Sequence, residues 1–230
     1  MKPETLHQLN LERAARRPAI VITDVASGKQ RLVKAADIAA EPLRGELAKQ
    51  LRMGKSGMIE AAGKKLFLNV YAPTAKLVIV GAVHISQALA PLARSLDYDV
   101  TVVDPRTAFA SPERFPDVPL IAEWPDVALP PLNIDHYTAF VALTHDPKID
   151  DPALLHAFQR DCFYIGALGS RKTHARRAER LAAQGAKPSD VARIHAPIGL
   201  PIGAVSPSEI AVAIMAEITA QLRLPKEAAA

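Results

Sequence analysis

The segment Thr144–Asp151 places three aspartates and one histidine within eight residues. A set of this kind can bind a metal ion, work as an acid/base pair or make polar contacts to a ligand. It also suits a turn and a helix cap, because Asp-Pro occurs twice and Asp151 is predicted as a helix N-cap. We keep both interpretations, assign no metal site, and treat Thr144, His145 and Asp146 as candidate ligand contacts.

A second polar segment, Gly166–Arg171, links a predicted strand to a predicted helix and contains two glycines, a hydroxyl and a guanidinium group. Backbone N–H groups at such a turn form a site for an anion together with the helix dipole. Further along the same helix, Arg177 and Arg180 are expected on a solvated face. The candidate ligand contacts here are Gly166, Gly169, Ser170 and Arg171.

The stretch Lys76–Arg106 has the pattern of a βαβ unit, because two apolar strands flank a helical pattern. Gly81, Val83 and Ser86 take the three positions that glycines occupy in a dinucleotide-binding fingerprint. Asp104 lies 23 residues beyond Gly81, about where the acidic residue that binds ribose is found in such folds. The candidate contacts in this stretch are Gly81, Ala82, Val83, His84, Asp104 and Arg106.

Val83 stands at the second of those glycine positions. A glycine there lets a pyrophosphate approach the backbone closely, whereas a β-branched side chain adds bulk and resists a positive φ. We therefore expect NAD(P) binding to be disfavoured. The sequence also has no Gly-x-Ser-x-Gly nucleophile elbow and no Walker loop, and we assign no catalytic residue.

Strands alternate with helices throughout the second part of the chain, which predicts an α/β fold with a Rossmann-like, doubly wound parallel sheet. Further strands are predicted at Leu120–Ala122, Thr138–Leu143 and Cys162–Ile165, and a capping box at Ser206–Glu209 begins the last helix. Pro91 should kink or shorten the first helix of this sheet. Ligands bind beyond the carboxyl ends of such strands, so the polar segments should converge on one crevice.

Length and composition indicate the domain division, the class of ligand and the compartment of the protein. Residues 1–73 predict a small N-terminal α+β region, and residues 74–230 the Rossmann-like domain. The net charge of +4 favours anionic ligands, but the aromatic content of 5% and the lack of a basic patch with interleaved aromatics disfavour nucleic acid. One cysteine, no apolar leader and no long apolar run predict a cytoplasmic protein without a membrane span.

A set of short motifs occurs in one order between Lys76 and Leu222. They are Gly81-Ala82-x-His84, Asp104-x-Arg106, Arg114-Phe115-Pro116, Thr144-His145-Asp146, Tyr164 to Arg171, Pro197-Ile198-Gly199-Leu200 and Pro207-x-Glu209-Ile210-Ala211. Together they resemble the XdhC/CoxI family, the xanthine dehydrogenase accessory factors. Residues 1–73 are similar to only a short version of the other domain of that family.

The resemblance implies a maturation factor that binds molybdenum cofactor (molybdopterin) and assists its sulfuration and insertion into a molybdenum hydroxylase. It implies a molybdenum hydroxylase apoenzyme as partner, with a cysteine desulfurase and a second copy of the chain as further candidates. The alternative is an NAD(P)-dependent oxidoreductase that uses the same crevice, and a third option is a non-catalytic scaffold. Val83 and the lack of a Tyr-Lys proton donor pair favour the non-catalytic chaperone.

Overall fold

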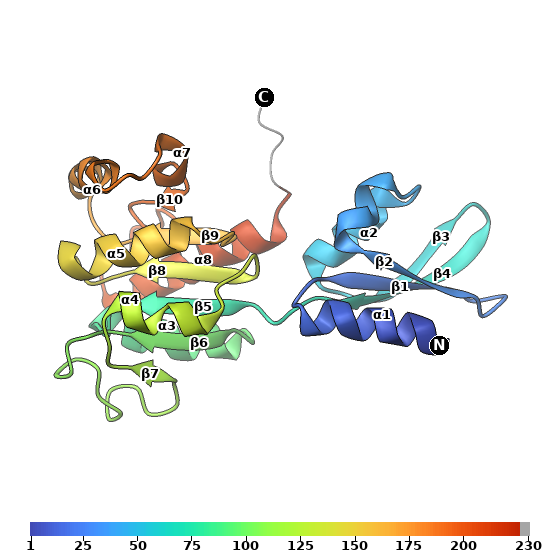
Figure 1. The fold of residues 1–230 in the computed structure, drawn as a ribbon, viewed down its shortest axis with the longest axis horizontal. Coiled ribbons are helices and arrows are strands. Elements are labelled where there is room, and N and C mark those ends of the chain that lie inside the picture. Colours follow the sequence, from blue (N-terminus) through green and yellow to red (C-terminus); the bar gives the residue numbers. More distant parts are fainter. Residues whose placement is uncertain (226–230) are drawn as a thin grey trace. The chain divides into compact units, whose positions relative to one another are not determined.

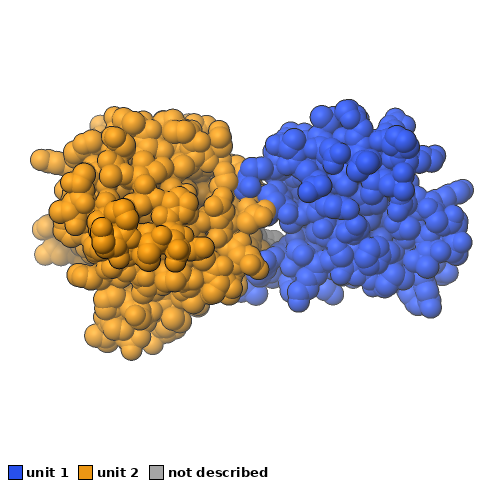
Figure 2. Space-filling view, turned by 90° about the horizontal axis from the view of Figure 1, so that it is seen from below, with its two compact units in different colours: residues 1–73, 223–225 blue, residues 74–222, 226–230 orange. Residues whose placement is uncertain are grey.

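The computed structural model describes residues 1–225, and the chain divides into two compact units. One unit comprises residues 1–73 with 223–225, and the other comprises residues 74–222 (Figure 2). The division falls at Pro73 and Thr74, where the last strand of the first unit has ended and the first strand of the second has yet to begin.

The first unit is a four-stranded antiparallel sheet with helices packed against it (Figure 1). Its strand order is β2-β1-β4-β3, and its core contains Ile20, Leu47 and Leu68. Pro42 separates the 3-10 helix Ala35–Ala40 from the helix Arg44–Met53, because proline supplies no N–H to continue a helix. The elements are α1 (Pro3–Ala14), β1 (Ala19–Asp24), β2 (Gln30–Lys34), the 3-10 helix η1 (Ala35–Ala40), α2 (Arg44–Met53), β3 (Gly57–Ala61) and β4 (Lys64–Tyr71).

The second unit contains a six-stranded, wholly parallel sheet with strand order β10-β9-β8-β5-β6-β7. Read from the β7 edge and numbered along the chain, this is the order 3-2-1-4-5-6 of the dinucleotide-binding fold, and it confirms the predicted fold class. The elements are β5 (Lys76–Val80), α3 (His84–Ser95), β6 (Asp99–Val103), β7 (Leu120–Ile121), α4 (Pro125–Ala128), η2 (Pro130–Leu132), β8 (Thr138–Ala142), α5 (Pro147–Phe158), β9 (Tyr164–Ala167), α6 (Arg171–Ala183), α7 (Pro188–Val191), β10 (Ile194–His195) and α8 (Pro207–Arg223).

Helices cover both faces of this sheet, because successive strand residues point to opposite faces and both sets are apolar (Figure 1). On one face, Leu77 and Ile79 pack with α3 and α8. On the other face, Val78 and Val80 pack with α4, α5 and α6. The strand order reverses between β5 and β8, so the switch point lies where Gly81 and Thr144 follow these two strands.

Several element boundaries differ from the prediction. The fifth strand spans Tyr164–Ala167 rather than Cys162–Ile165, so Gly166 lies within it. Helix α5 begins at Pro147 with Asp146 as its N-cap, so the N-cap prediction for Asp151 was wrong. Both Asp-Pro pairs fit a helix start, and the sequence alone did not separate them. Helix α3 continues past Pro91 to Ser95. Among the described residues, no helix is long and apolar enough to cross a membrane.

Candidate functional site

The first segment of the site is the turn after β5. Gly81 has φ +116°, and a Cβ atom there would lie 2.9 Å from Thr144 Cγ2, so only glycine fits. Val83 is the N-cap of α3 with an extended φ of −97°, so the left-handed backbone of the turn falls on Gly81 alone. Ser86 is fully buried and donates its hydroxyl hydrogen bond to the Gly81 carbonyl. His84 begins α3 and is exposed.

The second segment is an ion pair at the end of β6. Asp104 is fully buried, and Arg106 donates to both of its carboxylate oxygens, at 2.9 and 2.7 Å. The Ala82 N–H donates to Asp104 Oδ2 at 2.7 Å, which ties this segment to the first. Burial alone would raise the pKa of Asp104, but the hydrogen bonds from Arg106 and from the Ala82 N–H together lower it. Asp104 thus holds Arg106 in place, and both of its carboxylate oxygens accept hydrogen bonds from the protein.

The Arg106 guanidinium remains partly accessible, with 31% of its side chain exposed. Its Cζ atom lies 4.5 Å from the centroid of the Phe109 ring, within the range of a cation–π contact. The hydrogen bond from Arg106 to Asp104 raises the pKa of Arg106, and the charges of Asp146 and Asp150 act in the same direction. Arg106 is therefore a fixed positive charge near the segment that follows β8.

The third segment is the loop after β8, whose backbone is organised by Asp150. Asp150 Oδ1 accepts from the Thr144 hydroxyl at 2.6 Å and from its N–H at 3.2 Å, and Oδ2 accepts from the His145 N–H at 3.1 Å. His145 is left-handed, with φ +62°, and its side chain is exposed. The Asp146 side chain caps α5 by accepting from the Lys148 N–H. The loop therefore holds an exposed imidazole at the switch point.

A buried arginine connects this loop to the fourth segment. Arg177 Nη2 lies 3.8 Å from Asp150 Oδ2, and both side chains are 2% exposed. The same Nη2 donates to the Leu168 carbonyl at 2.7 Å. Burial raises the pKa of Asp150, with hydrogen bonds from Thr144 as the main opposing influence. The prediction of a solvated Arg177 was wrong, whereas Arg180 is partly exposed and pairs with Asp151 at 2.6 Å.

The fourth segment is the turn between β9 and α6. Gly169 has φ +130°, and a Cβ atom there would lie 3.0 Å from Thr173 Cγ2. Ser170 caps α6 by accepting from the Thr173 N–H, and Arg171 begins the helix with an exposed side chain. Gly166 lies in the strand, under Ile198, so it shapes the packing below the turn rather than the turn itself.

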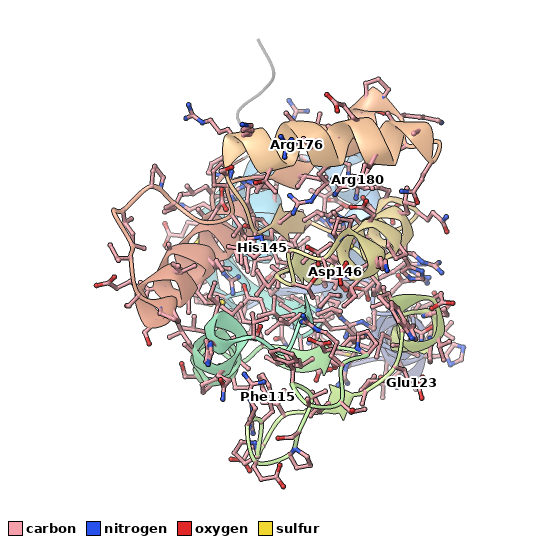
Figure 3. The ribbon with its side chains drawn as sticks, turned by 90° about the vertical axis from the view of Figure 1, so that its left-hand side faces the viewer. Phe115, Glu123, His145, Asp146, Arg176 and Arg180 are labelled. Atoms are coloured by element: carbon pink, nitrogen blue, oxygen red, sulfur yellow. The ribbon has the colours of Figure 1, made fainter. Side chains whose placement is uncertain are left out.

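All four segments lie at the carboxyl edge of the sheet and are linked by direct contacts. Figure 3 faces this edge, with His145 and Asp146 near its centre, α6 on one side and the segment around Phe115 on the other. The edge offers the fixed cation of Arg106, the N-termini of α3, α5 and α6, and polar backbone turns, which suit a ligand with anionic and hydrogen-bonding groups. No group of three or more histidine, cysteine or acidic side chains in residues 1–225 is arranged to hold a metal ion.

Two residues of this arrangement were missed by the sequence reasoning, namely Asp150 and Arg177. A signal for Arg177 did exist, because it lies four residues before Leu181, the other buried position of α6. A hollow of about 550 Å3 lies elsewhere, beside α6, α7 and β10, and is lined by His174 and apolar residues rather than by the four segments.

The second unit thus has a Rossmann-type fold, with polar side chains and charges of both signs at the carboxyl edge of its sheet. Residues 77–218 match the family model described as the XdhC Rossmann domain, and the chain belongs to this family. This confirms the resemblance found in the sequence.

Comparison with known proteins places the chain among relatives that are longer than itself. It is 34% identical over 154 residues to a protein of Bacillus subtilis named as a probable xanthine dehydrogenase component, covering 66% of the chain and 44% of the relative. It is 31% identical over 157 residues to the molybdenum cofactor insertion chaperone PaoD of Escherichia coli, covering 68% and 43%. The chain therefore spans less than half the length of these relatives. A crystal structure described as a xanthine dehydrogenase from Bacillus halodurans has the same fold, with a TM-score of 0.69, 24% identity, and coverage of 95% of this chain and 68% of that one.

Proposed function

We propose that the chain is a maturation factor that binds molybdenum cofactor at the carboxyl edge of the second unit and assists its sulfuration and insertion into a molybdenum hydroxylase. One observation carries the proposal: the four edge segments form a continuous set of contacts. Ala82 binds Asp104, Gly81 abuts Thr144, and Asp150 with Arg177 joins Thr144 to Leu168. A ligand at this edge meets pre-formed turns and does not have to order them.

The chemistry of the edge suits a pterin with a phosphate. Arg106 is held by two hydrogen bonds to Asp104 and is partly exposed, so its remaining N–H groups lose little freedom when they bind an oxyanion. The N-termini of α3 and α6 add partial positive charge in the same region. The names of two relatives, one for molybdenum cofactor insertion and one for a component of xanthine dehydrogenase, support the same class of cargo.

The proposal is tested by purifying the chain from cells that make the cofactor and assaying bound molybdenum and pterin. We expect both, in a ratio near one, and no oxidation of NADPH with small carbonyl substrates. Transfer of the bound cofactor to a molybdenum hydroxylase apoenzyme would then restore its activity. A chain that carries neither molybdenum nor pterin, but that oxidises NADPH, would replace this proposal with the oxidoreductase alternative.

A matched pair of variants locates the binding site. Arg106→Met should weaken cofactor binding by about tenfold or more, because charge-assisted hydrogen bonds contribute about 1.5–3 kcal/mol. Arg31→Met is the control, since Arg31 makes the same two-pronged contact to Glu41, at 2.6 Å for both bonds, in the first unit. If both variants lost the same affinity for the cofactor, the carboxyl edge would not be the binding site.

A further inference from the structure

A second polar network lies beside the carboxyl edge, around the last residue of β10. His195 ends this edge strand and is paired with Gly166 of β9 in parallel register. Glu217, from α8, contacts His195 Nδ1 through Oε1 at 2.9 Å. Its other oxygen, Oε2, accepts from the Tyr164 hydroxyl at 2.6 Å and from the Gly199 N–H at 2.8 Å. Both carboxylate oxygens are thus in use.

The protonation of this network follows from its contacts. Burial alone would raise the pKa of Glu217, but hydrogen bonds from His195, Tyr164 and the Gly199 N–H lower it. Burial raises the pKa of Tyr164, and its hydrogen bond to Glu217 does so as well, so Tyr164 is a donor. An ionised Glu217 can only accept, which fixes the proton of a neutral His195 on Nδ1. In the neutral form of His195 the lone pair is then on Nε2.

The ring that carries this lone pair is held firmly. The Tyr164 and His195 rings are stacked with centroids 4.7 Å apart and planes at 29°. Gly166 makes the packing possible, because a Cβ atom there would lie 2.5 Å from Ile198 Cδ1 and 2.8 Å from Tyr164 Cε1. The His195 side chain is nevertheless 29% exposed, and no residue in the described part of the chain hydrogen-bonds to Nε2. An oriented acceptor is therefore presented at the end of a strand.

We propose that His195 is a ligand contact, whose Nε2 accepts a hydrogen bond from an N–H or O–H group of the bound pterin. This inference rests on the function proposed above and adds a specific polar contact to it. Ligands of this fold lie beyond the carboxyl ends of the strands, and His195 is at that end of β10. A pterin ring carries N–H donors in its plane, which an oriented imidazole acceptor can distinguish from a ring that lacks them. Glu217 is a positioning residue that selects the tautomer, as a carboxylate does behind many functional histidines.

Chemical modification with diethylpyrocarbonate tests the contact directly, because the reagent attacks an unprotonated, accessible imidazole nitrogen. The probe is molybdenum cofactor released anaerobically from a purified molybdenum hydroxylase. We expect the cofactor to slow modification of His195 about tenfold, as measured by mass spectrometry of peptides. His136 is the internal control, because its Nδ1 also pairs with a carboxylate, Asp161 Oδ2, at 3.0 Å. Its side chain is 60% exposed, and it precedes β8, at the amino end of the strands. Its modification rate should not change.

Three variants separate a ligand contact from a purely structural role. His195→Phe keeps a ring to stack on Tyr164 but removes Nε2, and should raise the Kd for the cofactor about tenfold. Glu217→Gln can donate to Nδ1, which moves the imidazole proton to Nε2 and should weaken binding similarly. Tyr164→Phe leaves the His195–Glu217 pair intact and should bind as the wild type does. Trp124 fluorescence during denaturation reports whether each variant is folded.

These experiments distinguish failure of the His195 contact from failure of the proposed maturation role. If the wild-type chain binds the cofactor, but His195 is not protected and His195→Phe binds equally well, then this inference is wrong while the maturation role stands. If the wild-type chain does not bind the cofactor at all, both fail. If His195→Phe does not fold, the protection measured on the wild-type chain decides alone.

Discussion

Replacement of Asp150 by asparagine should destabilise the second unit and loosen the loop after β8. The change removes a buried negative charge and leaves Arg177, which is 2% exposed, without its counter-charge. Arg177 Nε and Nη1 are already buried without hydrogen-bond partners among the described residues. Asparagine also brings an NH2 group towards the Thr144 and His145 N–H donors, whose acceptors are the two Asp150 oxygens. At least one donor would then lose its acceptor.

The magnitude follows from burial. Removal of one partner of a buried ion pair costs about 3–5 kcal/mol. We expect a decrease of about 3 kcal/mol in the free energy of unfolding, because the Nη2–Oδ2 separation of 3.8 Å is long for a direct bond. For a domain of this size this corresponds to a fall in Tm of about 6–12 °C. Asp151→Asn is the matched control, since the guanidinium of its partner Arg180 is 37% exposed and can return to water, at a cost of about 1 kcal/mol.

Chemical denaturation followed by Trp124 fluorescence measures both variants, because this sole tryptophan belongs to the second unit. Hydrogen exchange at the Thr144 and His145 amides reports the loop itself, and protection there should fall in Asp150→Asn but not in Asp151→Asn. If both variants lose the same stability, or if the two amides remain protected in Asp150→Asn, the Asp150–Arg177 pair does not organise this loop.

Three further predictions concern the turns. Gly81→Ala should cost about 3 kcal/mol, from a positive φ and a close contact, whereas Gly28→Ala, where a Cβ atom meets open space, should cost about 1 kcal/mol; denaturation curves that rank them the other way would contradict the steric argument. Arg171→Ala, at the start of α6, should weaken cofactor binding about tenfold in calorimetry. Arg176→Ala, more than one turn further along the helix, should hardly change it. Val83→Gly should raise affinity for NAD(P) about tenfold through loss of bulk alone, since φ is negative there; unchanged affinity would show that the side chain is not the obstacle.

The sequence predicted the fold well because the parallel strands are short, continuous apolar runs that end in a polar residue or glycine. Five of the six strands of the second unit were found in this way. The sixth, Ile194–His195, is only two residues long and has no such pattern. Its pairing with β9 depends on tertiary contacts, which local periodicity does not record.

The sequence predicted which segments meet at the carboxyl edge, but not the buried contacts that connect them. The residues that follow strands were identified because strand ends fix where ligands bind in this fold. Asp150, Arg177 and Glu217 lie inside helices, and their spacing resembles that of ordinary surface charges. The burial of Asp150 and Glu217 depends on how α5 and α8 pack on the sheet, so it could not be inferred from their position in the sequence. Arg177 differs, because it lies four residues before Leu181 on the buried side of α6.

Three turns at the carboxyl edge share one backbone feature, a residue with positive φ. The turns after β5, β8 and β9 each contain one left-handed residue, namely Gly81, His145 and Gly169. Two are glycines and adopt this backbone at little cost, whereas His145 does so at a cost of about 1–2 kcal/mol. A conformation of this kind persists only where its surroundings hold it, and here the His145 N–H is held by Asp150. The hydrogen bond from the His145 N–H to Asp150 therefore stabilises at the turn after β8 a backbone that glycine adopts at the other two turns, and it leaves an exposed imidazole at this turn.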